Sequence, residues 1–205
     1  MTTQPTVIIG LHNPKSPTNV GAVMRAAGCY NATQVRYNGT RYNRAAKFQT
    51  DTQNSQARID LVEMDNLTAN LEQDVEIVCV ELVVGAVALP QFTHPDNAIY
   101  LFGPEDGSLP QEVVDQADHV VYIPTHGCMN LAATVNVVMY DRLAKTVGKI
   151  DDHEQVIANR DNKNRLKVKD RSRSLTRQSF HLLIKVQDGE GVAHAGGDDI
   201  NDTGT

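Results

Sequence analysis

Three short segments rich in Gly, Pro and Asn hold most of the side chains whose types and spacing could support chemistry. They lie between Leu11 and Val20, at Gly103–Leu109 and at Pro124–Asn130. None of them contains a GxGxxG dinucleotide signature or a Walker sequence. Irregular backbone of this kind suits the binding of a small ligand better than the cradling of a phosphate group at the start of a helix.

Four polar side chains in or beside these segments are the first candidates for a reaction: Asn19, Arg25, Glu105 and Asn130. Arg25 offers five donors and keeps its charge, so it could grip a phosphate and stabilise a developing alkoxide. Each residue also has a simpler interpretation. Arg25 could be a surface arginine paired with an acid. The two asparagines could be helix N-caps, and Glu105 a turn residue.

The third segment also contains two residues with nucleophilic or basic side chains, His126 and Cys128. Nothing nearby in the sequence lowers the pKa of Cys128, apart from the helix that is expected to follow it. A histidine in a loop is more often a surface residue than a catalytic base. We therefore interpret Cys128 as structural and His126 as a loop residue.

The elements that must position these segments follow an α/β pattern. Helices are expected from Thr18 or Asn19 to Ala27, at Met64–Leu71, after Pro110 and at Asn130–Val147, with a long surface loop over Asn38–Gln56. Strands are expected at Val7–Leu11, Gln34–Tyr37, Asp60–Glu63, Val75–Val84, Ala98–Phe102 and His119–Ile123. This order predicts a mostly parallel sheet with helices on both faces, and such a sheet places ligands at the carboxyl ends of its strands.

The composition fits one well-buried domain in a chain of 205 residues. Trp is absent and aromatic residues are few, so the core must consist mainly of aliphatic side chains. We expect no membrane span and no signal peptide. The three cysteines are far apart and form no CxxC pair, which favours a reducing cytoplasm and argues against a metal site.

Charge is segregated along the chain, although the formal net charge is −6. No Lys or Arg occurs from Ile59 to Asp141, whereas basic residues gather before this stretch and again from Arg160 to Arg177. Such segregation could steer a polyanion to one face of an acidic protein. A solvated face followed by a disordered tail explains the charges equally well.

Read in full, the three segments resemble the three ordered motifs of the SpoU (TrmH) family within the SPOUT class of RNA methyltransferases. They are NPKSPTNVGAVMRAA at Asn13–Ala27, IYLFGPEDGSLP at Ile99–Pro110 and IPTHGCMNLAATVNVVMYD at Ile123–Asp141. The resemblance covers about residues 7–147. One such motif would be weak support, but three in the right order at strand ends make chance an inadequate explanation.

The resemblance implies a fold, a cofactor and a reaction. Members of this family bind S-adenosylmethionine in a deep C-terminal trefoil knot, work as homodimers, and usually methylate a ribose 2′-hydroxyl of tRNA or rRNA. Residues 1–149 would form this methyltransferase domain, and residues 150–205 a charged, largely disordered extension. We expect no membrane or metal partner.

Roles for individual residues follow from their positions in the motifs. The expected catalytic residues are Asn19, Arg25, Glu105 and Asn130. The expected cofactor-binding residues are Leu101, Phe102, Gly103, Ile123, Cys128, Met129 and Leu131. The expected RNA-binding residues belong to the first basic segment and are Arg36, Arg41, Arg44 and Lys47.

Two departures from the family pattern keep an alternative open. Cys128 stands where a Ser is usual, and Ser108 stands where a Gly is usual. A thiol is a weaker hydrogen-bond donor than a hydroxyl group. The alternative is a knotted RNA-binding protein with impaired catalysis, and a weaker third hypothesis is methylation of a base atom. The proton acceptor also stays open, because a deprotonated Arg25 is costly and an RNA phosphate could serve instead.

Overall fold

The computed structural model describes residues 4–46, 59–148 and 150–168, and the chain divides after Ile150 into two compact units. The second unit contains helix α5 (Asp152–Asn159), which the sequence did not predict. The Asp151 carboxylate caps α5 by accepting hydrogen bonds from the backbone N–H groups of His153 and Glu154. Most of the extension that we expected to be disordered lies outside the described residues.

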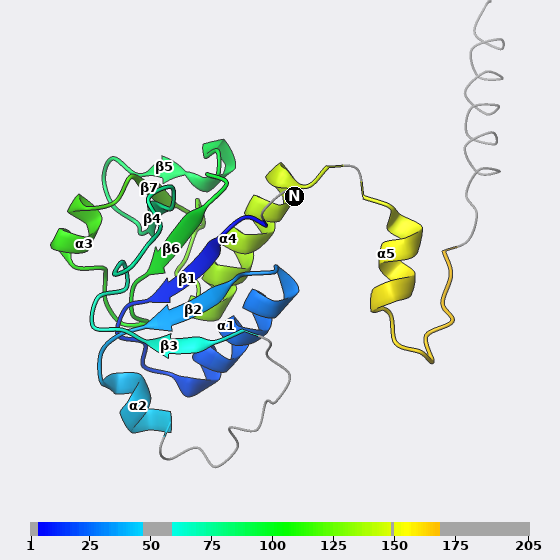
Figure 1. The fold of residues 1–205 in the computed structure, drawn as a ribbon, viewed down its shortest axis with the longest axis horizontal. Coiled ribbons are helices and arrows are strands. Elements are labelled where there is room, and N and C mark those ends of the chain that lie inside the picture. Colours follow the sequence, from blue (N-terminus) through cyan, green and yellow to red (C-terminus); the bar gives the residue numbers. More distant parts are fainter. Residues whose placement is uncertain (1–3, 47–58, 149, 169–205) are drawn as a thin grey trace, which may run out of the picture. The chain divides into compact units, whose positions relative to one another are not determined.

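The first unit is built on one parallel sheet, as predicted (Figure 1). Its strand order is β3-β2-β1-β6-β4-β7-β5, and all six strand pairs are parallel. The strands are β1 (Val7–Leu11), β2 (Gln34–Tyr37), β3 (Leu61–Glu63), β4 (Glu76–Val80), β5 (Val87–Ala88), β6 (Ala98–Phe102) and β7 (His119–Tyr122). Because all the strands point the same way, their carboxyl ends meet at one edge of the sheet.

Helices cover both faces of this sheet, which confirms the α/β prediction. Helices α1 (Pro17–Cys29) and α4 (Leu131–Thr146) pack against each other and against one face (Figure 1). Side chains of α3 (Gln111–Asp115) join the hydrophobic cluster on the other face. Among the described residues, none of the helices combines the length and apolarity that crossing a membrane requires.

Five local features differ from the sequence prediction. Strand β4 stops at Val80 rather than Val84, and the apolar side chains that follow it are partly or fully exposed. Strand β5 and the short 3-10 helix η1 (Leu89–Gln91) were not predicted. Residues 64–71 form turns rather than a helix. Helix α2 (Arg41–Ala46) occupies part of the stretch that we expected to be a loop.

The two helix starts beside the motifs illustrate how local chemistry sets element boundaries. Ser16 caps α1 with its hydroxyl group, which accepts a hydrogen bond from Asn19 N, so the predicted cap at Thr18 or Asn19 was wrong. The helix begins earlier because Pro17 suits the first helical position. Asn130 caps α4 as predicted, since its Oδ1 accepts from Ala133 N at 2.7 Å.

A buried polar network fastens the second half of α4 to the segment that precedes β6. The imidazole of His94 lies between the Tyr100 hydroxyl group and the Asp141 carboxylate, at 2.7 and 2.9 Å. Arg142 donates to Tyr100 Oη and to the carbonyls of Pro95 and Asp96. Lys145 pairs with Asp141 at 2.6 Å and donates to two further carbonyls. These bonds satisfy charges that burial would otherwise make costly.

Candidate functional site

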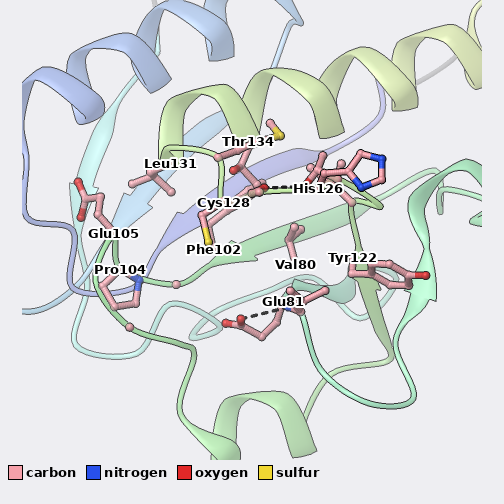
Figure 2. Close-up of a pocket in the computed structure, with 17 residues that line it drawn as sticks. Val80, Glu81, Phe102, Pro104, Glu105, Tyr122, His126, Cys128, Leu131 and Thr134 are labelled. Carbon is pink, nitrogen blue, oxygen red and sulfur yellow. Dashed lines mark hydrogen bonds between the residues drawn. The ribbon is translucent and has the colours of Figure 1, made fainter.

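A pocket of about 480 Å³ opens at the carboxyl ends of β4, β6 and β7 (Figure 2). This volume lies within the ordinary range for small-molecule sites. The pocket is lined by Val80, Glu81, Leu82, Phe102, Gly103, Pro104, Glu105, Gly107, Tyr122, Ile123, Thr125, His126, Gly127, Cys128, Met129, Leu131 and Thr134. The second and third sequence motifs therefore meet at one ligand-sized cavity.

Two opposed walls define the pocket. Figure 2 shows His126, Cys128, Leu131 and Thr134 on one side, from the loop after β7 and the start of α4. Val80, Glu81 and Tyr122 lie on the opposite side. The walls combine aliphatic surface with a small number of polar groups, a composition typical of sites that bind a partly apolar ligand.

Six of the seven residues predicted to contact a cofactor line the pocket, and Leu101 does not. Leu101 is buried on the other face of the sheet with Ile99 and Leu109, whereas Phe102 faces the pocket. Successive side chains of a strand point to opposite faces, so Leu101 and Phe102 cannot both reach one cavity. Leu101 therefore does not line this pocket, unlike the other six residues predicted to bind a cofactor.

Several lining residues were not predicted from the sequence, notably Val80, Glu81 and Leu82. We had placed all three inside a longer strand, whereas the chain leaves the sheet after Val80. The signal that was missed is Glu81, an acidic residue in an apolar run, which marks the end of the buried segment. Tyr122 and Thr134 were also missed.

Motif one and motif two are joined by hydrogen bonds to a single carboxylate, that of Glu105. Its Oε1 accepts from Asn19 Nδ2 at 3.0 Å and from Ser16 N at 3.0 Å, and its Oε2 accepts from Lys15 N at 2.8 Å. Burial raises the pKa of Glu105, but these hydrogen bonds outweigh it, so the pKa is lowered overall. Glu105 therefore stays ionised and fixes the start of α1 beside the pocket.

Arg25 and Asn130, the two remaining catalytic candidates, do not line the pocket. Arg25 is exposed on α1, two turns beyond the Ser16 cap. Within the described part of the chain, its guanidinium group forms no hydrogen bond or ion pair with another residue. Its donors are thus open to an external anion. The Asn130 side chain is used by the cap of α4.

The predicted RNA-binding arginines have three different environments. Arg36 is buried and donates to the carbonyls of Leu67 and Ala69, so it is not offered at the surface, contrary to our expectation. Arg41 forms two hydrogen bonds of 2.8 Å with Asp106. Arg44 is exposed, whereas Lys47 lies outside the described residues.

Asp106 draws two cations to the rim of the pocket. It pairs with Arg41 and, at 3.4 Å, with Lys15. The hydrogen bond from Arg41 is the main reason that the pKa of Asp106 is lowered to about 2. The rim therefore holds two cations, Lys15 and Arg41, beside two carboxylates, Glu105 and Asp106.

The three cysteines are all free and differ in exposure. Cys29 and Cys128 are exposed, whereas Cys79 is buried in β4, where burial raises its pKa to about 12. In the described residues, no group of three or more His, Cys, Asp or Glu side chains is arranged to hold a metal ion.

Comparison with known proteins links this geometry to one group. The model of the SpoU rRNA Methylase family matches residues 6–140. No curated protein matches the chain. Similar solved structures include an rRNA methyltransferase from Sinorhizobium meliloti, with a TM-score of 0.55 and 18% identity over 72% of this chain. The chain spans 60% of the length of that structure.

Two further structures share the fold. The SpoU methyltransferase AviRb from Streptomyces viridochromogenes, in complex with AdoMet, has a TM-score of 0.58 and 16% identity, with 71% of this chain and 59% of that chain covered. A structure solved for insight into 2-OH methylation of C/U34 on tRNA has a TM-score of 0.60 and 22% identity, with 72% and 95% covered. At such identities the similarity is one of fold.

Proposed function

Because the chain belongs to the SpoU rRNA Methylase family, we propose that it transfers a methyl group from S-adenosylmethionine to a ribose 2′-hydroxyl of tRNA or rRNA. The observation that supports this proposal is the hydrogen bond from Asn19 Nδ2 to Glu105, which joins motif one to a residue that lines a ligand-sized pocket. One similar structure was solved with AdoMet, and another concerns 2-OH methylation of tRNA.

The cofactor is proposed to occupy the pocket at the ends of β4, β6 and β7. Phe102, Gly103, Ile123, Cys128, Met129 and Leu131 would hold it, because all six line this cavity. Leu131 and Met129 offer apolar surface to the adenine, and Gly103 lets the ligand approach the backbone. When bound, the cofactor supplies an electrophilic methyl group.

The residues of the chain would orient the acceptor and stabilise charge. Arg25 would grip the RNA phosphate and stabilise the developing alkoxide, because its donors have no partner among the residues that the structure describes. Glu105 and Asn19 position the start of α1, and hence Arg25. Asn130 would act by fixing the start of α4, which bears Leu131. Lys15, Arg41 and Arg44 would supply phosphate contacts.

Methyl transfer to RNA tests the proposal. Purified protein is incubated with tritiated S-adenosylmethionine and total tRNA and rRNA, and label in the RNA is counted. Arg25→Ala should lower incorporation about 100-fold or more if Arg25 stabilises transition-state charge. Glu72→Ala, an exposed residue away from the pocket, is the control and should retain wild-type incorporation. Equal incorporation by Arg25→Ala and wild type would remove Arg25 from the mechanism.

The chemical position of the label separates ribose from base methylation. A 2′-O-methyl group blocks alkaline cleavage, so the label should be recovered in alkali-resistant dinucleotides. Label recovered only in mononucleotides would instead support methylation of a base atom. Mapping 2′-O-methylation in RNA from a deletion strain would then identify the target nucleotide.

Impaired catalysis is the second candidate function, and Cys128 is the observation that favours it. Its thiol lies in the pocket wall where the family usually has a Ser. Titration calorimetry distinguishes the two functions. If neither S-adenosylmethionine nor S-adenosylhomocysteine binds while RNA still does, the chain is an RNA-binding protein.

The trefoil knot, homodimer and cytoplasmic location are parts of the same proposal. The loop after β7 leads to α4, which packs against α1 on one face of the sheet. A trefoil knot would require this loop to pass through another loop of the chain. Exposed apolar side chains on α4, including Val137 and Tyr140, support a second copy as partner. An RNA substrate and three free cysteines suit the cytoplasm.

A further inference from the structure

Glu81 is a carboxylate in the pocket wall that the proposed chemistry leaves without a role. It follows β4 directly, between the lining residues Val80 and Leu82. Figure 2 shows it on the wall opposite Cys128 and Thr134, away from Glu105. A charged group in such a position needs an explanation, because partial burial of a carboxylate is unfavourable unless polar partners compensate for it.

Main-chain donors hold the Glu81 carboxylate in a fixed place. Its Oε2 accepts from Leu109 N at 2.8 Å, and its Oε1 accepts from Leu82 N at 3.1 Å. The first hydrogen bond joins the loop after β4 to the end of motif two. The second joins the Glu81 side chain to the backbone of the next residue in its own loop. The carboxylate is therefore positioned before any ligand arrives, which reduces the ordering cost of binding.

The Glu81 carboxylate also keeps capacity for two more donors. An ionised carboxylate has about four acceptor sites, and two of these are used by backbone N–H groups. Glu105, the other acid in the pocket lining, already accepts three hydrogen bonds. The hydroxyl groups of Thr125 and Thr134, which also line the pocket, do not donate to Glu81, because they donate to the carbonyls of Gly127 and Asn130. Among the lining residues, Glu81 is the carboxylate with the most remaining acceptor sites.

The location of Glu81 specifies which donors it would meet. Glu81 and Gly103 are neighbours in the pocket lining, because a Cβ atom at Gly103 would lie only 3.3 Å from Glu81 Oε2 and 3.1 Å from Leu109 N. The missing side chain of Gly103 thus leaves room for the carboxylate beside the backbone of motif two. The lining residues on either side of Glu81, Val80 and Leu82, are apolar and would take the flat face of a base. A group that lies beside a base and presents two adjacent hydroxyl donors is the 2′,3′-diol of a ribose.

We propose that Glu81 is a specificity-determining residue that binds the ribose diol of a nucleoside ligand through its carboxylate. The proposal rests on the proposed function, since it takes the nucleoside to be that of S-adenosylmethionine. An acidic side chain on the ribose hydroxyls of a nucleotide cofactor is a recurrent solution in α/β sheets that bind at their strand ends. Here the acid comes from the loop after β4.

A double-mutant cycle between protein and ligand tests the proposal. Calorimetry measures the binding of S-adenosylhomocysteine and of its 2′-deoxy and 3′-deoxy analogues to wild type, Glu81→Ala and Glu81→Gln. Wild type should bind the parent ligand about tenfold or more tightly than either deoxy analogue, because hydrogen bonds to a charged acceptor are strong. This preference should vanish in Glu81→Ala and be reduced in Glu81→Gln.

The preference is a ratio of two affinities measured on one variant, so general weakening of the loop cancels from it. Glu112→Gln, on α3 outside the pocket, is the matched control and should keep the wild-type preference. If Glu81→Ala keeps the full preference, or if wild type shows none, Glu81 does not recognise the diol and serves only to fasten the loop. If wild type binds no S-adenosylhomocysteine at all, the proposed function itself fails.

Discussion

At the scale of single residues, the rim of the pocket is organised by one acid between two bases. Arg41 and Lys15 both pair with Asp106, and α2 is thereby attached to motif two. Arg41 is thus both a candidate phosphate contact and the residue that governs the ionisation of Asp106. This pairing connects Arg41, an RNA-binding candidate, to motif two.

Removal of Arg41 should change the titration of Asp106. In Arg41→Ala, we expect the pKa of Asp106 to rise from about 2 toward its ordinary value of 3.8, because ionisation loses its main stabilising partner. Side-chain carboxyl shifts followed by NMR from pH 1.5 to 6 measure the change. Arg44→Ala is the control and should leave this pKa as it is in the wild type. An unchanged Asp106 titration in Arg41→Ala would mean that the ion pair does not form in solution.

Thiol reactivity provides a second test at the residue scale. We expect DTNB to modify Cys29 and Cys128 in the native protein and to leave Cys79 unmodified, because Cys79 is buried with a pKa of about 12. In a Cys29→Ser variant, S-adenosylhomocysteine should slow the reaction of Cys128 about tenfold or more at a concentration ten times its Kd. Modification of Cys128 at the same rate with and without the ligand would place the ligand away from this wall.

The residues that the sequence could and could not identify differ in the kind of signal they carry. Glu105 and Gly103 stand in a turn directly after a strand, and such a position favours a site. Leu101 and Phe102 are both fully buried, so the usual alternation of polar and apolar residues is missing. Which of the two faces the pocket depends on the register of β6 against β1 and β4, and the sequence does not contain that information directly.

At the scale of elements, the buried network around His94 holds α4 in place. Its imidazole contacts Asp141, and Arg142 and Lys145 are nearby. Burial is the main cause that lowers the pKa of His94, and the positive charges of Arg142 and Lys145 act in the same direction, whereas Asp141 opposes them. The folded protein therefore binds a proton at His94 less readily than the unfolded chain does.

Stability should consequently fall on the acid side of pH 6.5. A histidine with a depressed pKa in the folded state contributes fully above its unfolded pKa, and its contribution is lost as pH falls below that value. The loss is at most ~1.4 kcal/mol per pH unit, the effect of one proton. Urea unfolding at pH 7.5, 6.5 and 5.5 measures it, and the His94→Gln variant should show a shallower slope. Identical slopes in the two proteins would exclude His94 as the source.

Element prediction succeeded for β1, β2, β6 and the long helix α4, and it failed at β5 and at the end of β4. The bounds of β1, β2 and β6 match the predicted strands, and α4 differs from its prediction by one residue at each end. The two-residue strand β5 is too short to produce a periodic signal. The end of β4 was missed because Leu82 and Val84 are apolar yet exposed, and apolar type alone does not reveal exposure.

At the scale of the whole molecule, oligomeric state is the property that the proposed function makes testable. Val137, Tyr140 and Leu143 are exposed apolar residues spaced three apart on α4. We expect light scattering after gel filtration to give the mass of a dimer for wild type and of a monomer for Tyr140→Glu, because a buried unpaired charge is costly. Val84→Glu, on the exposed loop after β4, should remain dimeric. A monomeric wild type would contradict the proposed dimer.

The strand order has a consequence for the order of events during synthesis. Strand β6 lies between β1 and β4, and Ile9 pairs with Tyr100, which follows it much later in the chain. The last wall of the pocket, at Leu131 and Thr134, comes from a helix that is made after every strand. A nascent chain emerging from the ribosome therefore has no binding site until nearly all of this unit has been translated. Contacts so distant in sequence also slow folding. We therefore expect each newly made chain to bind its ligand late, at a rate set by the folding of this unit.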